Sequence, residues 1–187
     1  MAELGLEWDG VTGFTLLGRG TAIRRTDGRV PATDHRFIVG RGKRLLTAPT
    51  ELLDGVAEAL RDASTRYSLL LITKGDLFDQ ETKLAQSGLG DLFAGVEILS
   101  DKTAGTYASL LKRRGIEPAE FVMVGNSLRS DVAPVVEVGA RAVHIPYHVT
   151  WSHEHLPDGV LPPSGWYRLN GLSELGALLE SIDQPPA

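Results

Sequence analysis

The hydrophobic and polar positions of this chain follow two patterns that alternate from about residue 67 onward. Short, nearly continuous apolar runs predict parallel strands, because strands covered on both faces have few polar residues. We expect these strands at residues 67–72, 96–99, 121–124 and 142–145. Between and after them, apolar residues recur every three or four positions, which predicts helices at residues 77–87, 103–114, 132–138 and 169–182. The alternation predicts an α/β fold with a three-layer, Rossmann-like parallel sheet.

The first part of the chain, residues 1–47, has a different pattern. It is rich in Gly, Arg and Thr, and its apolar residues are scattered, which predicts two loosely packed helices at residues 14–25 and 32–46. A further helix is expected after Thr50, with Leu52 and Leu53 on its apolar face. The change of pattern predicts a helical segment over residues 1–47 and an α/β core over residues 48–187.

Composition narrows the classes of function. The 187 residues contain no cysteine, which excludes disulfides, thiolate catalysis and thiolate metal sites. No apolar run reaches the length of roughly 20 residues that a membrane span needs, and no signal-peptide pattern is present, so a cytoplasmic location is expected. The net charge of −5 gives no general attraction to nucleic acid or to an anionic membrane. An anionic substrate must therefore be held by local positive groups.

Polar side chains follow three of the predicted strands. Ligands of open α/β sheets bind at the carboxyl ends of the strands, so these side chains are candidates for a common site. Thr73 follows the first strand, and its hydroxyl suits a phosphoryl oxygen, while the neighbouring Lys74 is a candidate contact for substrate. Lys102 follows the second strand and could neutralise charge on a transferring phosphoryl group. Alternatively, Thr73 is a helix cap or turn former and the lysines are solvated.

The third cluster is Gly125-Asn126-Ser127 with Asp131 four residues further on. Asp131 could hold a metal ion directly or through water, and Asn126 can add a neutral carbonyl oxygen. The hydroxyl of Ser127 is a candidate contact for substrate. The alternative is that Ser127 and Asp131 only cap the helix that follows.

This ordered set of motifs resembles the haloacid dehalogenase-like (HAD) hydrolase superfamily, over residues 49–151. The resemblance rests on Ile72-Thr73, on Lys102 and on Gly125-Asn126-Ser127-Leu-Arg-Ser-Asp131, and the N-terminal residues 13–23 look like part of a helical cap. It implies hydrolysis of a small phosphorylated molecule, a phosphate monoester. Thr73 and Lys102 would be catalytic, Lys74 and Ser127 would bind substrate, and Asn126 and Asp131 would hold Mg²⁺.

The sequence departs from the family pattern at the nucleophile. The family has an Asp-x-Asp motif on its central strand, and no Asp-x-Asp occurs here; Glu7-Trp8-Asp9 is interpreted as a chance match because no apolar strand precedes it. We therefore expect the nucleophile to lie outside this chain, which alone would be inactive or weakly active. The central strand, between the strands that end near Thr73 and Val124, would also be missing. A sheet with such a gap predicts a homo-oligomer or a marginally stable chain.

A second departure is Asn126, where the family usually has a metal-binding Asp. Loss of one negative charge should weaken Mg²⁺. An Asn near this position is similar to the metal-independent dehalogenase branch, which keeps a 2-haloacid dehalogenase as an alternative. Another alternative is a non-catalytic module that binds phosphate or a partner.

Four histidines, His144, His148, His153 and His155, are expected to cluster after the last strand. The pair His153 and His155 could bind a transition metal. The favoured interpretation is that this loop forms a rim of the active-site crevice.

Overall fold

A computed structural model describes residues 28–46, 52–75, 77–147 and 160–183, together with Thr26 and Leu156. Several predicted features lie outside these described residues: the helix 14–25, Glu7-Trp8-Asp9, Thr50, and the histidines His148, His153 and His155.

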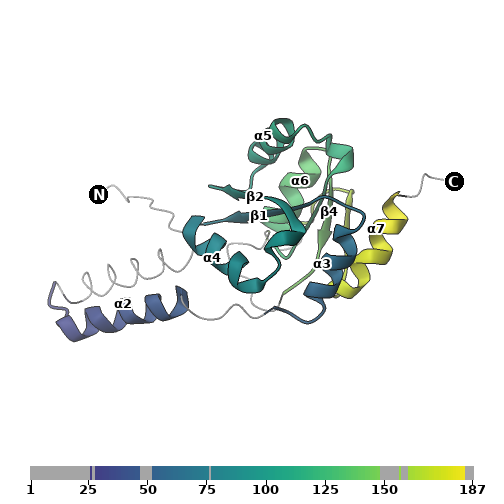
Figure 1. Ribbon diagram of the computed structural model, residues 1–187. Helices are drawn as coiled ribbons and strands as arrows, with labels where there is room; N and C mark the ends of the chain where they lie inside the picture. Colours follow the sequence, from purple (N-terminus) through teal and green to yellow (C-terminus); the bar gives the residue numbers. More distant parts are fainter. Residues whose placement is uncertain are drawn as a thin grey trace. The chain divides into compact units, whose positions relative to one another are not determined.

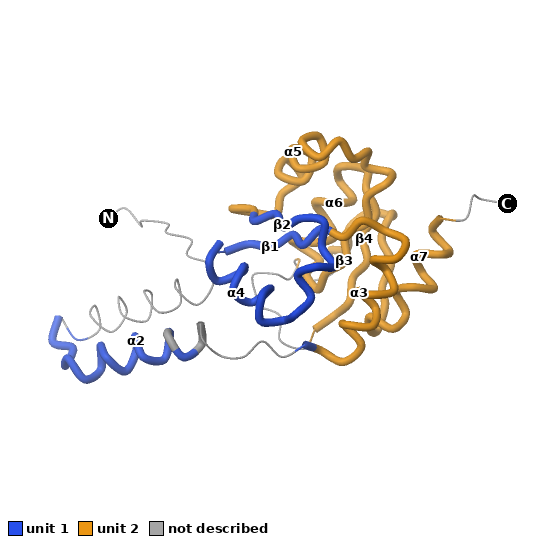
Figure 2. Tube along the Cα trace, in the orientation of Figure 1, with its two compact units in different colours: residues 1–52, 70–98 blue, residues 53–69, 99–187 orange. Residues whose placement is uncertain are grey.

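The chain divides into two compact units, which Figure 2 colours separately. Unit 1 comprises Met1–Leu52 and Leu70–Ile98, and unit 2 comprises Leu53–Leu69 and Leu99–Ala187. Unit 1 therefore combines the N-terminal segment with the first pair of strands. The predicted division near residue 47, between a cap segment and an α/β core, stays a prediction.

The strands of unit 1 are β1 (Leu69–Lys74) and β2 (Phe93–Leu99), which form a two-stranded sheet. Both lie on predicted apolar runs, but the predicted bounds were wrong. β1 begins at Leu69 because the amide of Tyr67 still donates to the carbonyl of Ala63, at 2.9 Å, in the turn that ends the preceding helix. As a result, Thr73 lies within the strand and not one residue beyond it.

The helices of unit 1 agree with the sequence pattern. The structure has α2 at Ala32–Leu46 and α4 at Leu77–Ser87, and both bounds are as predicted. After α4, Gly88 adopts a left-handed conformation with φ 66°, which glycine tolerates and which stops the helix. A short 3₁₀ turn, η1 (Gly90–Leu92), then leads directly into β2.

Unit 2 contains a three-stranded sheet in the order β3-β4-β5. The strands are β3 (Val122–Gly125), β4 (Arg141–His144) and β5 (Trp166–Arg168), and both pairings are parallel. The sequence analysis was wrong in taking residues 142–145 as the last strand. The three residues of β5 follow a proline-containing stretch and are too few to show a periodic pattern.

Helices lie on both sides of this sheet. Figure 1 shows α5 and α6 on one side of β4, with α3 and α7 on the other. The bounds of these helices are α3 (Val56–Ser64), α5 (Ala104–Arg114), α6 (Ala133–Glu137) and α7 (Leu175–Asp183). Short turns are η2 (Pro118–Glu120), η3 (Leu128–Val132) and η5 (Leu172–Glu174). Parallel strands alternating with helices form an α/β fold of the Rossmann-like kind, as predicted.

The helix α5 has clear start and stop signals. Thr103 caps its first turn and accepts a hydrogen bond from the amide of Thr106, whose hydroxyl accepts one from the amide of Thr103 in return. Gly115 ends the helix in a left-handed conformation. Tyr107 and Leu110 are completely buried, so this helix is firmly anchored just after Lys102.

The core of unit 2 contains Val143, Leu169, Leu175 and Leu179. The predicted helix over residues 169–182 was wrong at its start. Leu169 belongs to the buried core directly after β5, and Gly171 is in an extended conformation, so α7 begins only at Leu175.

The helix predicted from Thr50 also begins later than expected. Gly55, with φ 78°, precedes α3, and Leu52 and Leu53 are exposed. Gly55 in this conformation separates these two leucines from the helical face. In the described part of the chain, no helix has both the length and the apolar character needed to cross a membrane.

Candidate functional site

The centre of the candidate site is an ion pair between Lys102 and Asp131, both in unit 2. The amine Nζ of Lys102 lies 2.7 Å from Oδ1 of Asp131. The side chains are only 11% and 6% exposed, so this pair is shielded from water. Lys102 stands just before the cap of α5, and Asp131 lies in the turn after β3, so two separate strand-to-helix connections meet here. The lysine is therefore not the solvated surface residue of the alternative interpretation.

The turn that carries Asp131 has an unusual hydrogen-bond pattern. η3 is a π-helical turn, in which the amide of Val132 donates to the carbonyl of Ser127, five residues before it, at 3.2 Å. Single π-helical turns are rare in proteins, and those that do occur often lie at functional sites. The π turn directly precedes α6, which lies within the helix predicted over residues 132–138 but begins one residue later, so the sequence analysis missed the turn.

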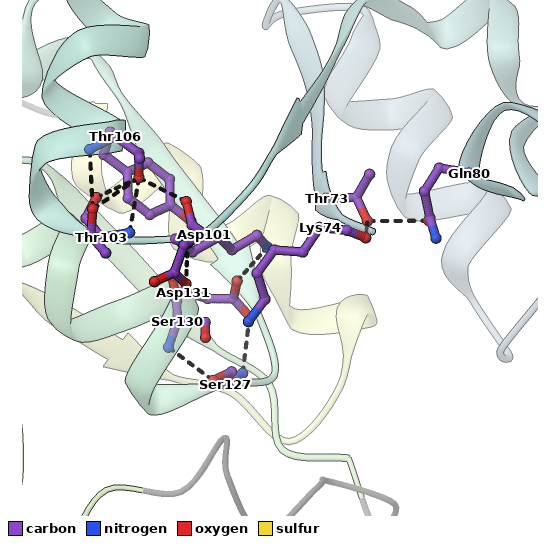
Figure 3. A network of polar contacts seen from close by, with 11 residues as sticks. Thr73, Lys74, Gln80, Asp101, Thr103, Thr106, Ser127, Ser130 and Asp131 are labelled. Carbon is purple, nitrogen blue, oxygen red and sulfur yellow. Dashed lines mark hydrogen bonds and ion pairs between the residues drawn. The ribbon is translucent and has the colours of Figure 1, made fainter. Parts of the chain in front are cut away.

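Ser127 stabilises this turn at its start. Its hydroxyl accepts from the amide of Ser130 at 2.9 Å, and its own amide donates to Oδ2 of Asp131 at 3.0 Å (Figure 3). The alternative interpretation of Ser127 as a cap is therefore correct in part. Its predicted role as a contact for substrate stays a prediction.

Gly125 is required by the close approach of Asp131. A Cβ atom added at position 125 would lie only 2.6 Å from Cβ of Asp131, closer than real Cβ contacts allow. The backbone conformation of Gly125 does not itself demand glycine, because its φ is not positive. The glycine of this motif is thus explained by space for the carboxylate.

Tyr107 connects α5 to the same π turn. Its hydroxyl donates to the carbonyl of Ser130 at 3.2 Å, inside the core and beside the ring of Phe121. In an α-helix this carbonyl would accept from the amide four residues later, but that residue is Pro134, which has no N–H. The sequence analysis missed this contact, although the proline was a visible signal.

Asn126 is exposed, and its backbone carbonyl lies 3.0 Å from Nε2 of His144. His144 is the last residue of β4 and is buried, so it does not belong to a loop after the strand, as predicted. Burial lowers the pKa of His144, and the positive charge of Arg168 acts in the same direction. The hydrogen bond to Asn126 and the charge of Asp131 act against this shift.

Thr73 and Lys74 end β1 in unit 1 and are both half-buried. The hydroxyl of Thr73 donates to Oε1 of Gln80 at 3.1 Å (Figure 3). Gln80 lies in the first half of α4 and was not singled out in the sequence, because a glutamine on a helix has no distinctive pattern.

The structure thus brings together three of the six predicted site residues, Lys102, Ser127 and Asp131, with Asn126 adjacent in sequence. Thr73 and Lys74 belong to the other compact unit. The expectation that Thr73 shares one anion-sized site with Lys102 and Asp131 stays a prediction.

The donors at this site suit a hard cation in kind but are few in number. Among the residues that the structure describes, no group of three or more Asp, Glu or His side chains is placed to hold a metal ion. The carboxylate of Asp131 and the side-chain oxygen of Asn126 are donors of the kind that Mg²⁺ prefers. Asp131 already binds the amine of Lys102 and the amide of Ser127. A Mg²⁺ site at Asn126 and Asp131 therefore stays a prediction, and an ion there would need most of its other ligands from phosphate and water.

Comparison with known proteins places the chain among hydrolases. A haloacid dehalogenase-like family hydrolase from Xanthomonas campestris is 37% identical, with a TM-score of 0.83, and the match covers 96% of this chain and 72% of that one. A HAD phosphatase from Thermococcus onnurineus, 24% identical with a TM-score of 0.60, has the same fold over 87% of this chain and 80% of its own.

Curated relatives are also similar in sequence. Human N-acylneuraminate-9-phosphatase is 28% identical over an alignment of 141 residues, and the match covers 71% of this chain and 53% of that protein. The mouse enzyme of the same name is 29% identical over the same shares. This chain therefore spans about half the length of the curated relatives that it matches. No protein-family model matches the chain. The identity and coverage of the Xanthomonas hydrolase nevertheless decide the family: this chain belongs to the haloacid dehalogenase-like hydrolases.

Proposed function

We propose that this chain provides the phosphoryl-binding scaffold of a phosphatase that acts on small phosphate monoesters. The observation that carries the proposal is the shielded ion pair of Lys102 and Asp131 at the ends of two strand-to-helix connections. An amine held in place by a buried carboxylate is suited to stabilise charge on a transferring phosphoryl group. The similarity to N-acylneuraminate-9-phosphatases supports this reaction over other hydrolyses.

Each residue has a separate role in this proposal. Lys102 neutralises charge on the phosphoryl oxygens, and Asp131 fixes the position of its amine. Thr73 donates its hydroxyl to a phosphoryl oxygen, while Lys74 and Ser127 contact the substrate. Asn126 and Asp131 would hold Mg²⁺, which supplies further positive charge to the phosphoryl oxygens when it is bound.

In our proposal, this chain lacks the nucleophile that attacks the phosphorus atom. A phosphoenzyme route needs a nucleophilic carboxylate, and the Asp-x-Asp pattern is not present in the sequence. The described strands form two separate hydrogen-bonded sheets, with β1 in one and β3 in the other. The chain alone should then bind phosphate but turn over esters poorly.

The binding half of the proposal is tested by titrating the purified chain with inorganic phosphate in a calorimeter. Thr73→Val removes one hydrogen bond to an anion and should weaken phosphate binding about tenfold. Thr65→Val is the matched control, because it removes a hydroxyl that only bonds the carbonyl of Asp62 at the end of α3. Absence of phosphate binding, or equal affinities for Thr73→Val and the unmodified chain, would contradict the proposal.

The catalytic half is tested with a generic phosphate ester and Mg²⁺. Slow or absent turnover is expected from this chain. Rapid turnover that Glu7→Gln abolishes would instead make Glu7 the nucleophile. Binding without any turnover, even after an Asp-x-Asp strand is supplied, would favour the non-catalytic module. Release of halide from a 2-haloacid without added metal would favour the dehalogenase.

A further inference from the structure

Behind the Thr73 hydroxyl, a short polar network runs along α4 of unit 1. The hydroxyl donates to Oε1 of Gln80 at 3.1 Å and has a second, longer contact of 3.3 Å to the carbonyl of Lys74. A hydroxyl group has a single proton. Because the contact to Gln80 is the shorter of the two, we take Gln80 as the main acceptor of the proton that a phosphoryl oxygen would need.

The orientation of Gln80 is itself fixed by its neighbour. Nε2 of Gln80 donates to Oδ2 of Asp79 at 3.3 Å, and Asp79 is only 5% exposed. The amine of Lys83 lies 2.8 Å from the same Asp79 oxygen. An ionised carboxylate can only accept hydrogen bonds, so it attracts the NH₂ group of Gln80 and leaves the carbonyl oxygen facing Thr73. Lys83, Asp79 and Gln80 thus form one chain of contacts that ends at the Thr73 proton.

We propose that Gln80 is a positioning residue that controls hydrogen-bond donation by Thr73. In the free protein Gln80 accepts the Thr73 proton and holds the hydroxyl in one rotamer. An anion at Thr73 must displace this contact, so the strength of the acceptor at position 80 opposes anion affinity. The inference rests on the proposed function of Thr73 as a phosphoryl-binding residue.

Two substitutions of similar size separate this role from simple packing. Gln80→Met removes the acceptor, so phosphate affinity should rise about three- to tenfold, the equivalent of one ordinary hydrogen bond. Gln80→Glu provides a stronger, charged acceptor and repels an anion, so affinity should fall about tenfold or more. Loss of packing alone would not raise affinity in one variant and lower it in the other.

Two controls show whether the effect acts through Thr73. In a Thr73→Val background, Gln80→Met should no longer change phosphate affinity, because no proton remains to be released. Gln86→Met makes the same substitution at an exposed position of α4 and should leave the affinity unchanged. A fall in affinity for Gln80→Met, with binding still dependent on Thr73, would overturn the inference and leave the proposed function standing.

A measurement without phosphate tests the inference by itself. Three-bond NMR couplings to the Thr73 methyl carbon report its side-chain rotamer. These couplings should indicate one rotamer in the unmodified chain and averaging in Gln80→Met, with no change in Gln86→Met. If the chain binds no phosphate, the proposed function fails, and the couplings alone decide this inference: unchanged values in Gln80→Met refute it.

Discussion

Removing the amine of Lys102 should destabilise the protein far more than removing an exposed charge. In Lys102→Met, the carboxylate of Asp131 stays buried at 6% exposure and keeps only the amide of Ser127 as a described partner of its Oδ2 atom. At 2.7 Å and an effective dielectric constant of about 20, the lost attraction is about 6 kcal/mol. Part of this is offset because the lysine no longer has to be dehydrated. Measured losses for a broken buried pair are about 3–5 kcal/mol, which we expect here.

The assay is urea unfolding monitored by circular dichroism. The free energy of unfolding is compared among four proteins: the unmodified chain, Lys102→Met, Asp131→Asn and the double variant. Each single variant leaves one buried partner uncompensated, whereas the double variant leaves none. The double variant should therefore lose less than the sum of the two single losses, by about 2 kcal/mol or more. Equal slopes against urea concentration are needed for this comparison, because the chain has two compact units.

The matched control is an ion pair that is exposed. Arg66 contacts Glu180 at 2.8 Å, but the two side chains are 33% and 63% exposed. Glu180→Gln should therefore cost less than about 1 kcal/mol. If Lys102→Met costs no more than Glu180→Gln, or if the two single losses simply add, the Lys102–Asp131 pair is not the shielded unit that we describe.

Three further predictions concern single positions. Gly125→Ala should lower the free energy of unfolding by about 2 kcal/mol or more in urea unfolding, because its Cβ would overlap Asp131; unchanged stability would contradict this packing. Asn126→Asp should tighten Mg²⁺ binding about tenfold in calorimetry by adding a charged ligand, and an equal affinity would refute its role at the metal. The hydrogen bond to Asp183, with burial second, raises the pKa of Tyr67 above 10.0. The stabilisation from this hydrogen bond is therefore present below pH 10 and lost as the pH rises through the folded-state pKa of Tyr67. In urea unfolding above pH 10, the free energy of unfolding of Tyr67→Phe should decrease less with pH than that of the unmodified chain, and an equal decrease would contradict this.

The sequence predicted the elements that have strong local signals. The helices at residues 32–46 and 77–87 were predicted with the observed bounds, since a change of pattern or a glycine marks their ends. The carboxyl ends of successive strands also identified Lys102 and Asp131, which are 29 residues apart yet form an ion pair. This prediction needs no knowledge of contacts, because the carboxyl ends of parallel strands lie at the same edge of a sheet.

Other features depend on tertiary contacts that no local pattern encodes. β5 has three residues, too few for a periodic pattern, and is recognised only by its parallel pairing with β4. The π turn depends on Pro134 and on the buried hydroxyl of Tyr107, which lies 23 residues from its partner carbonyl. Gln80 has a role only because β1 ends beside the first half of α4.

In the proposed function, the charges at the candidate site predict two opposite effects of Asn126, one on Mg²⁺ and one on phosphate. Lys102 and Asp131 form a pair with no net charge, so in the proposed site the amine acts on a phosphoryl group only at close range and the pair adds little long-range attraction. An Asp at position 126 would make the site one unit more negative, which favours Mg²⁺ and repels phosphate unless the ion is bound. Asn126 removes that charge, so phosphate can approach Lys102 with less dependence on the metal. In the proposed site, Asn126 is therefore expected to weaken a cation site and to favour an anion, so phosphate binding with little dependence on Mg²⁺ is the expected outcome.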